Sequence, residues 1–277
     1  MNIEWPCGPT YWTMGRTLCV SIPFTWNLPE VRRIVRVGSL VHDNFLVGGP
    51  AVEMMPGYFD GIPGVTVGHE YPGVLQRVNP QATRSTTGCV RKCEFCAIGT
   101  GRIESGGMKR LDDWPDLPVY CDNNILSAGR AHFDRVMDRL EKHGWGDFNQ
   151  GIDARLLIEY HAERFMRVKG LTIRLALDSE SDTKRWEKAF DILRAAGIAL
   201  SRIRSYVLIG FNSGSSSAWR MCRWIETFGV KPLPMWFHRL DAMEPNVVTC
   251  DQEKEGWTDF ERRRIMQWFY QHKEAVA

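Results

Sequence analysis

Apolar residues in the last two thirds of the chain recur with two different periods. Short runs rich in valine, isoleucine and leucine, of which residues 171–177 are the clearest, alternate with stretches in which apolar residues return every three or four positions. The first pattern is typical of buried strands and the second of amphipathic helices. Because strands that alternate with helices assemble into a parallel sheet, the sequence predicts an α/β fold.

Six strands and five helices are expected after residue 83. The strands are expected at residues 84–87, 118–121, 148–152, 171–177, 206–209 and 234–237, and the helices at 128–143, 158–168, 181–197, 215–229 and 258–272. Glycines end three of these helices, where a left-handed residue is favoured. Repeated strand-helix units of this kind predict an open, partial (βα)6 barrel that resembles part of a TIM barrel.

The first 83 residues have a different texture. Nine of the 14 prolines fall within residues 1–80, and only two strand-like runs stand out, at 17–22 and 45–47. Prolines interrupt helices and central strands, so this segment is expected to be an irregular cap of short strands and turns. The expected regions are therefore the N-terminal cap at 1–83, the barrel core at 84–250 and a C-terminal helix at 251–277.

Composition and charge argue against several classes of protein and favour one cellular compartment, but they do not identify a binding partner. The 35 basic and 33 acidic residues leave a formal charge of +2, so charge alone predicts no nucleic-acid partner. The first residues lack the basic-then-apolar pattern of a secretory signal, and no apolar run is long enough for a membrane span. The eight cysteines are too scattered for a disulfide framework. We expect free thiols in a reducing cytoplasm.

Three of the cysteines lie within eight residues. Cys89, Cys93 and Cys96 have the spacing Cys-x3-Cys-x2-Cys, which brings three thiolates within reach of one metal centre. A four-iron cluster usually takes four cysteines, so three leave one iron with an open position for a ligand. Two alternatives add Cys121 as a fourth ligand: a structural zinc site and a closed iron–sulfur cluster for electron transfer.

This motif, with Phe95 before its last cysteine, resembles the signature loop of the radical S-adenosylmethionine (SAM) enzymes. The resemblance covers residues 84–241 and is closest to members that usually carry an N-terminal cobalamin-binding domain, of which residues 1–83 look like a remnant. It implies a [4Fe-4S] cluster on the three cysteines, with SAM on the open iron. Reductive cleavage of SAM then produces methionine and a 5′-deoxyadenosyl radical, which abstracts hydrogen from a substrate.

The resemblance also implies which residues hold SAM. Asp122 follows the second expected strand, where related enzymes contact the amino group, and Arg155 follows the third and is expected near the carboxylate. Asp178 and Ser179 are similar to a Glu-Ser element after the fourth strand and are expected at the ribose or the amino group. Simpler roles stay open: an ion pair of Arg155 with Asp153, a helix cap for Asp178 and an Asx turn for Asp122.

Other polar residues are candidate substrate contacts. Gln150 in the third expected strand, and His238 and Arg239 after the sixth, are assigned this role. Small radical SAM proteins with an abbreviated front end resemble bacteriophage enzymes that decorate DNA bases, which implies rearrangement or coupling of an amino-acid-modified thymine. The arginines at 262–264 lie near tryptophans and suit phosphate contacts and base stacking, or else form a solvated helix face. A peptide or a small metabolite is the alternative substrate.

The expected cofactors are the [4Fe-4S] cluster and SAM, without cobalamin. Residues 1–83 are too few for a doubly wound cobalamin domain, and no Asp-x-His-x-x-Gly motif supplies a cobalt-ligating histidine. The expected partners are a reductant such as flavodoxin or ferredoxin and a substrate that is DNA or a modified nucleotide, with no membrane. A non-catalytic iron–sulfur or zinc protein is the alternative from another functional class.

Overall fold

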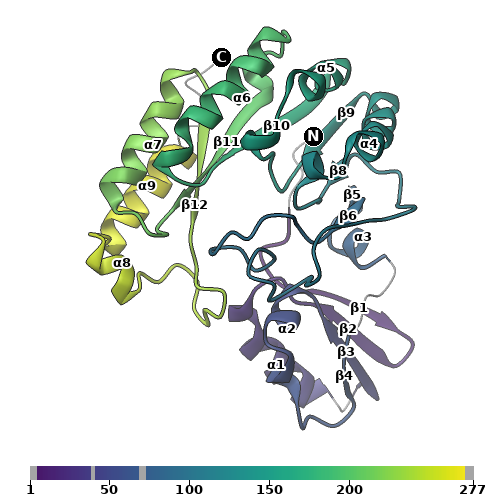
Figure 1. The fold of residues 1–277 in the computed structure, drawn as a ribbon. Coiled ribbons are helices and arrows are strands. Elements are labelled where there is room, and N and C mark those ends of the chain that lie inside the picture. The colour runs from purple at the N-terminus through teal and green to yellow at the C-terminus, as the bar shows by residue number, and fades with distance from the viewer. Residues whose placement is uncertain (1–4, 39–40, 69–72, 272–277) are drawn as a thin grey trace. The chain divides into compact units, whose positions relative to one another are not determined.

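The computed structural model describes residues 5–38, 41–68 and 73–271, which fall into two compact units (Figure 1). The smaller unit takes Met1–Ala82, Arg91–Gly106 and His238–Pro245, and the larger unit takes Thr83–Val90, Gly107–Phe237 and Asn246–Ala277. The chain therefore passes from one unit to the other five times. No helix within the described ranges is long and apolar enough to cross a membrane.

The larger unit is built on a six-stranded sheet with the order β12-β11-β10-β9-β8-β5. Neighbours from β8 to β12 pair in parallel, and a helix joins each strand to the next. The strands are β5 (Ala82–Thr83), β8 (Val119–Tyr120), β9 (Trp145–Phe148), β10 (Gly170–Leu177), β11 (Ile203–Ile209) and β12 (Lys231–Trp236), and the helices between them are α4 (Arg130–His143), α5 (Glu159–Arg167), α6 (Thr183–Ala195) and α7 (Ser215–Thr227). This arrangement confirms the α/β fold and its parallel sheet.

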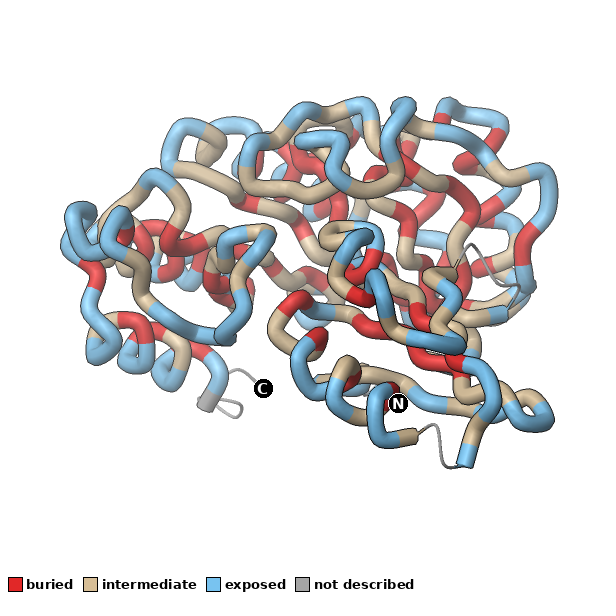
Figure 2. Tube along the Cα trace, turned by 90° about the horizontal axis from the view of Figure 1, so that it is seen from below, coloured by how far each residue is buried: buried red, intermediate tan, exposed pale blue. Residues whose placement is uncertain are grey.

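Alternation along β10 explains which face of the sheet the helices cover. Leu171, Ile173, Leu175 and Leu177 are buried, and they share one hydrophobic core with helix residues such as Trp186. The residues between them are only half-buried, because successive side chains of a strand project from opposite faces. Figure 2 shows how buried, half-buried and exposed positions alternate along the trace. One face of the sheet thus carries the core, and the other is open to polar residues.

Two further helices complete the larger unit. The short helix α8 (Cys250–Lys254) contains the buried Gln252, whose Nε2 donates to two backbone carbonyls at 2.9 and 3.2 Å. The last helix, α9 (Asp259–Gln271), packs on β12 and buries Ile265 and Phe269 in the same core as the sheet. The C-terminal segment is therefore an integral part of the larger unit.

The smaller unit has a sheet of its own, with the order β1-β2-β3-β4. The first pair is antiparallel and the other two pairs are parallel. The strands are β1 (Thr10–Met14), β2 (Thr17–Ser21), β3 (Asn44–Gly48) and β4 (Val65–Val67), with helices α1 (Leu28–Gly38), α2 (Pro50–Met54) and α3 (Val74–Val78). This sheet and its helices are more regular than the expected cap. Pro29, Pro50 and Pro56 lie in the first turns of helices, where the missing N–H costs nothing.

The first strand of the sheet lies earlier in the chain than the expected range of 84–87. The sheet strand is β5, and the chain then leaves the sheet. The next residues form β6 (Thr86–Thr87), which pairs in antiparallel fashion with β7 (Lys109–Arg110). The segment before Cys89 is therefore held by a separate two-stranded ribbon.

The third expected strand, 148–152, also differs from the observed one. β9 ends at Phe148, and the chain turns with the N–H of Gly151 donating to the carbonyl of Phe148 (3.0 Å). Gly151 has φ +90°, a conformation that a side chain disfavours, so the turn requires a glycine. Ile152 adds one isolated parallel bridge to Leu175 of β10. The apolar residues of the expected strand thus lie partly in β9 and partly beyond this turn.

Candidate functional site

Cys93 and Cys96 lie in a tight coil of the smaller unit. The N–H of Cys96 donates to the carbonyl of Cys93 (3.1 Å), and the N–H of Thr100 donates to the carbonyl of Cys96 (2.9 Å). Gly99 closes against this coil so tightly that a Cβ atom there would lie 2.6 Å from both the N and the O of Cys93. The backbone itself shapes this loop, and only glycine fits where it closes.

Cys89 belongs to the larger unit, and the residue before it is anchored there. The carbonyl of Gly88 accepts from Asn123 Nδ2 (3.1 Å), shortly after β8. Gly88 has φ +68°, and a Cβ atom on it would lie 2.0 Å from the carbonyl oxygen of Gly107. The approach to Cys89 is therefore fixed beside the carboxyl end of a sheet strand by a close backbone crossing.

The three thiols have the chemistry that an iron–sulfur cluster needs, and they are divided between the two units, with Cys89 in the larger one and Cys93 and Cys96 in the smaller one. Cys89, Cys93 and Cys96 form no disulfide bond within the described residues and are partly exposed, and thiolates are the ligands that such clusters take. Within the part of the chain that the structure describes, no three histidine, cysteine, aspartate or glutamate side chains are arranged to hold a metal ion. The same holds for the sets that add Cys121. The case for the cluster therefore depends on the spacing along the sequence.

Cys121 has the surroundings of a structural cysteine. Its N–H donates to the carbonyl of Thr83 (2.8 Å), which extends the pairing of β8 with β5. Burial raises the pKa of its thiol to about 12. Metals bind the thiolate, so a thiol that stays protonated at neutral pH is a poor ligand until a metal displaces its proton.

Asp122, directly after β8, accepts four hydrogen bonds. Its Oδ1 accepts from the N–H of Ser85 (2.8 Å) and from the N–H and Oγ1 of Thr86 (2.5 and 2.7 Å), and its Oδ2 accepts from Ser85 Oγ (3.0 Å). The residue is 4% exposed, and burial raises its pKa while these donors lower it. Asp122 thus ties the end of β8 to the segment that leads to Cys89. Its expected contact with SAM stays a prediction.

Four polar residues meet where β8, β9 and β10 end. Asn124 Nδ2 donates to Asp153 Oδ2 (3.1 Å), and Arg155 Nε donates to Asp153 Oδ1 (2.6 Å). Arg155 Nη2 lies 3.9 Å from Asp178 Oδ2. The carboxyl ends of parallel strands share one edge of a sheet, where ligands of α/β proteins bind. We call Asn124, Asp153, Arg155 and Asp178 the edge cluster, and it contains the ion pair expected between Asp153 and Arg155.

Asp178 is the acidic member of the edge cluster with the weakest compensation. Burial raises the pKa of its carboxyl to about 6, Arg155 lowers it, and Asp182 and Asp153 raise it further. Its separation of 3.9 Å from Arg155 is too long for a strong charge-assisted hydrogen bond. A carboxyl with this pKa is present in both protonation states near neutral pH, so it can accept or donate a hydrogen bond.

Asn124 is the member of the edge cluster that no sequence motif marks. It is 4% exposed, and its Oδ1 has no hydrogen-bond partner among the described residues, while its Nδ2 is engaged by Asp153. A buried oxygen without a donor is costly, so this acceptor is suited to an N–H or O–H group of a ligand. The signal in the sequence was a pair of asparagines immediately after an expected strand and Asp122.

Ser179 and Gln150 make no contact that places them in the edge cluster. Ser179 Oγ lies 2.7 Å from Ser181 Oγ and donates to Asp182 Oδ2 (3.2 Å), in the turn before α6. Gln150 is exposed in the turn after β9, so the interpretation that it projects from within a strand is wrong. Its role as a substrate contact stays a prediction.

His238 and Arg239 belong to the smaller unit, whereas the edge cluster belongs to the larger one. The ring of His238 packs on Trp26, with centroids 4.8 Å apart. Arg239 Nε pairs with Asp241 Oδ1 at 3.2 Å, and the Arg239 side chain is 62% exposed. Their contact with substrate stays a prediction.

The three consecutive arginines of α9 all have acidic partners on their own helix. Arg262 and Arg263 both pair with Asp259, at 2.7 and 2.6 Å, and Arg264 pairs with Glu261 at 3.4 Å. Arg262 is buried, and the other two are exposed. This arrangement favours a solvated helix face over a dedicated nucleic-acid contact.

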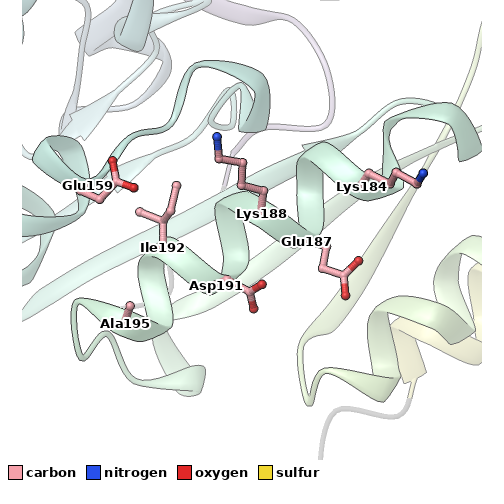
Figure 3. A pocket seen from close by; sticks show the side chains of 7 residues that line it. All are labelled: Glu159, Lys184, Glu187, Lys188, Asp191, Ile192 and Ala195. Atoms are coloured by element: carbon pink, nitrogen blue, oxygen red, sulfur yellow. The ribbon is translucent and has the colours of Figure 1, made fainter.

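A shallow pocket of about 450 Å³ lies on the helical side of the larger unit (Figure 3). It is lined by residues of α5 and α6, namely Glu159, Lys184, Glu187, Lys188, Asp191, Ile192 and Ala195. Its charged side chains alternate in sign, and none of them belongs to the edge cluster. The pocket therefore presents no convergent set of groups for catalysis.

No protein-family model matches the chain, and no curated protein matches it either. The candidate site therefore depends on the residues of this chain and on their geometry.

Proposed function

We propose that the chain is a radical SAM enzyme. The observation that carries this proposal is the spacing of Cys89, Cys93 and Cys96, because three closely spaced thiolates are the ligand set of a cluster with one open iron. When bound, such a cluster supplies the electron that splits the sulfonium of SAM into methionine and a 5′-deoxyadenosyl radical. None of the three cysteines forms a disulfide bond within the described residues, and all three are partly exposed, which is compatible with metal binding.

The edge cluster supports the proposal independently of the cysteines. In this proposal the Arg155 guanidinium binds the carboxylate of SAM, and Asp178 accepts from the ribose hydroxyls or the amino group, with Ser179 beside it. Asn124 Oδ1 is an acceptor for a ligand N–H or O–H. Asp122 contributes by position, because its four hydrogen bonds hold the segment that leads to Cys89.

We further propose that the six-stranded sheet is an open, partial (βα)6 barrel with its chemistry at the carboxyl edge. The strands β8 to β12 follow one another across the sheet in chain order, as strands do in a closed barrel. The proposal includes a reducing cytoplasm and a reductant protein such as flavodoxin or ferredoxin. Its proposed substrate is an amino-acid-modified thymine in DNA, with a peptide or a small metabolite as the alternative, and Gln150, His238 and Arg239 are the proposed substrate contacts.

Iron content and SAM cleavage test the proposal. Anaerobically reconstituted protein is expected to bind about four irons per chain and to convert SAM into 5′-deoxyadenosine when dithionite is added. Cys93→Ala is expected to lose both properties, because two remaining thiolates cannot hold the cluster. The matched control is Cys7→Ala, which removes an exposed cysteine outside the motif and should keep both.

Undiminished SAM cleavage by Cys93→Ala would show that the cluster assignment is wrong. Zinc in place of iron, in protein purified without oxygen, would establish the structural alternative instead. Once cleavage is observed, deuterium transfer from a labelled candidate into 5′-deoxyadenosine identifies the substrate.

A further inference from the structure

Strand β12 is the outermost strand of the six-stranded sheet, and two of its six residues are prolines (Figure 1). One side of β12 pairs with β11, and within the described residues no strand pairs with its other side. An unpaired strand edge is a template on which another strand can add, so natural sheets usually protect it. Pro232 and Pro234 cannot donate a hydrogen bond to such a strand, because proline has no backbone N–H.

The register of the sheet shows that both prolines face the unpaired side. The N–H of Phe237 donates to the carbonyl of Ile209 on β11 (2.9 Å). Backbone groups along a parallel strand point alternately to its two sides, so the odd-numbered residues of this stretch face β11 and the even-numbered ones face outward. Two of the three outward residues of β12 are therefore prolines. We call the outward side of residues 232–236 the β12 edge.

A hydroxyl group of the last helix occupies an acceptor on the β12 edge. Tyr270 Oη donates to the carbonyl of Pro234 (3.1 Å). This contact shows that the carbonyl of Pro234 is directed away from β11, in agreement with the register. It also takes one of the acceptors that an added strand would need. Helix α9, which supplies Tyr270, packs on β12, so the contact lies within the larger unit.

Apart from its prolines, this stretch has the composition of an aggregation-prone strand. Residues 231–237 contain one charged residue, Lys231, and otherwise only apolar and aromatic side chains. Met235 is 45% exposed on the face of the sheet opposite the helices, which we call the open face. Short segments with high β-propensity, little charge and no proline are those that stack into intermolecular sheets. At the other end of the sheet, β5 has only two residues and offers little to pair with.

We propose that the β12 edge blocks strand addition, so that the six-stranded sheet does not pair with a second copy of this chain. A second copy carries the same edge, and identical edges can pair about a two-fold axis. The prolines remove two donors, and Tyr270 occupies an acceptor. The buried proline rings also pack towards the helices, but valine would fill such positions of a strand at least as well. The missing N–H groups therefore separate edge protection from packing alone.

The proposal concerns the backbone of one strand and does not depend on the proposed function. If the proposed function holds as well, a substrate on this side of the sheet meets the side chains of the open face and not a seventh strand. Association can be measured on the full-length protein without iron, SAM or a reductant. A failure of the cluster assignment therefore leaves this test intact, and the reverse is also true.

Restoring the two N–H groups tests the proposal. At increasing protein concentration, light scattering after size-exclusion chromatography should show an apparent mass about twofold that of the unsubstituted protein, or more, for the double variant Pro232→Val and Pro234→Val. Pro232→Ala with Pro234→Ala restores the same donors without added volume and should associate as well. Circular dichroism and urea unfolding establish that each variant is folded. Met235→Lys, added to the valine variant, places a charge on the open face of the same strand and should reverse the association.

The matched control removes two exposed prolines that lie outside the strands. Pro80→Val with Pro115→Val gives the unfolded chain the same added freedom and should keep the mass of the unsubstituted protein. A folded valine or alanine variant with an unchanged mass would overturn the proposal. So would an equal rise in the control, or association that persists after Met235→Lys. Failure of both edge variants to fold would assign the prolines to packing and overturn it too.

Discussion

Asp122 and Asp178 both follow a parallel strand, yet their carboxyl groups have different surroundings. Asp122 receives four hydrogen bonds from Ser85 and Thr86, so its buried charge is compensated. Asp178 has only a distant contact with Arg155, and two other carboxyl groups raise its pKa. A poorly compensated carboxyl is typical of a residue that awaits a ligand, whereas a saturated one holds the backbone in place.

Asp178 makes the stability of the protein depend on pH. With a pKa near 6 in the folded state, above its ordinary value, it binds more protons folded than unfolded between about pH 4 and 6. The free energy of unfolding therefore falls as pH rises through this window. The Asp178→Asn variant has no carboxyl group to titrate, so its free energy of unfolding does not fall in this way. At pH 7 it is expected to be more stable than the unsubstituted protein by on the order of 2 kcal/mol. Urea unfolding from pH 4 to 8 measures it.

The difference between the variant and the unsubstituted protein isolates this one group, since all other groups titrate in both. The difference should be small at pH 4 and grow to its full value above pH 6. Asp191→Asn, on an exposed part of α6, is the control for simple removal of charge. A difference that does not change with pH would contradict the assignment to Asp178.

A site residue could be predicted from the sequence only where its pattern lies within a short stretch of consecutive residues. The cysteine spacing and the aspartates after expected strands are visible in a few consecutive letters. Asn124 could not be recognised as an unpartnered acceptor, because that depends on a hydrogen bond from its amide nitrogen to Asp153, which follows β9 in the chain. The pairing of Arg174 with Arg204 could not be predicted at all, since the two become neighbours only through the register of β10 with β11.

Among the elements, the loop before the cysteines is shaped by a backbone crossing. Gly88 and Gly101 both have positive φ, +68° and +71°, but only Gly88 has a neighbour in the way: a Cβ atom there would lie 2.0 Å from the carbonyl oxygen of Gly107. Nothing lies within 4 Å of a Cβ atom placed on Gly101. The two glycines thus separate the effect of backbone conformation from that of crowding.

We expect Gly101→Ala to lower the free energy of unfolding by about 1 kcal/mol, from backbone strain alone. Gly88→Ala should lose roughly 3 kcal/mol or more, because overlap with Gly107 adds to the same strain. Equilibrium unfolding in urea compares the two. Equal losses would mean that the crossing of Gly88 with Gly107 does not constrain the loop.

Elements with strong periodicity were predictable, and those defined by pairing were not. The helices α4, α5, α6, α7 and α9 lie within a few residues of their expected limits, since helical spacing of apolar residues reports burial directly. Strand β10 alternates over its whole length for the same reason. In contrast, β5 and β8 have two residues each, and neighbouring strands rather than local pattern define them.

In the whole molecule, the smaller unit is assembled from separate segments of the chain, and these contribute unequally to its core. The smaller unit draws on three separate segments, but its buried core residues all fall within the first of them. That core comprises Val20, Ile22, Leu28, Val31, Val35, Phe45, Val47, Ala51, Val52 and Phe59. The other two segments add contacts such as the hydrogen bond from Thr25 Oγ1 to the carbonyl of Ala242 (2.5 Å). The core is thus complete before those segments are added.

A fragment of residues 1–82 is therefore expected to fold. It contains the four-stranded sheet and its entire core, and domains of this size can fold alone, although with modest stability. Circular dichroism should show both helix and strand, and urea unfolding should be cooperative with a lower midpoint than in the full chain. A spectrum typical of random coil would show that the later segments are needed for folding.

The five passages of the chain between its units have a consequence for biosynthesis. Trp26 stacks on Phe24, whose side chain is part of an exposed surface, and also packs on His238 of the last segment of the smaller unit. At 5–20 residues per second, that segment leaves the ribosome roughly 10–30 s after Ala82. During this interval the nascent polypeptide displays an aromatic surface without its partner, of the kind that chaperones recognise. Slow translation would prolong that exposure and favour misassembly.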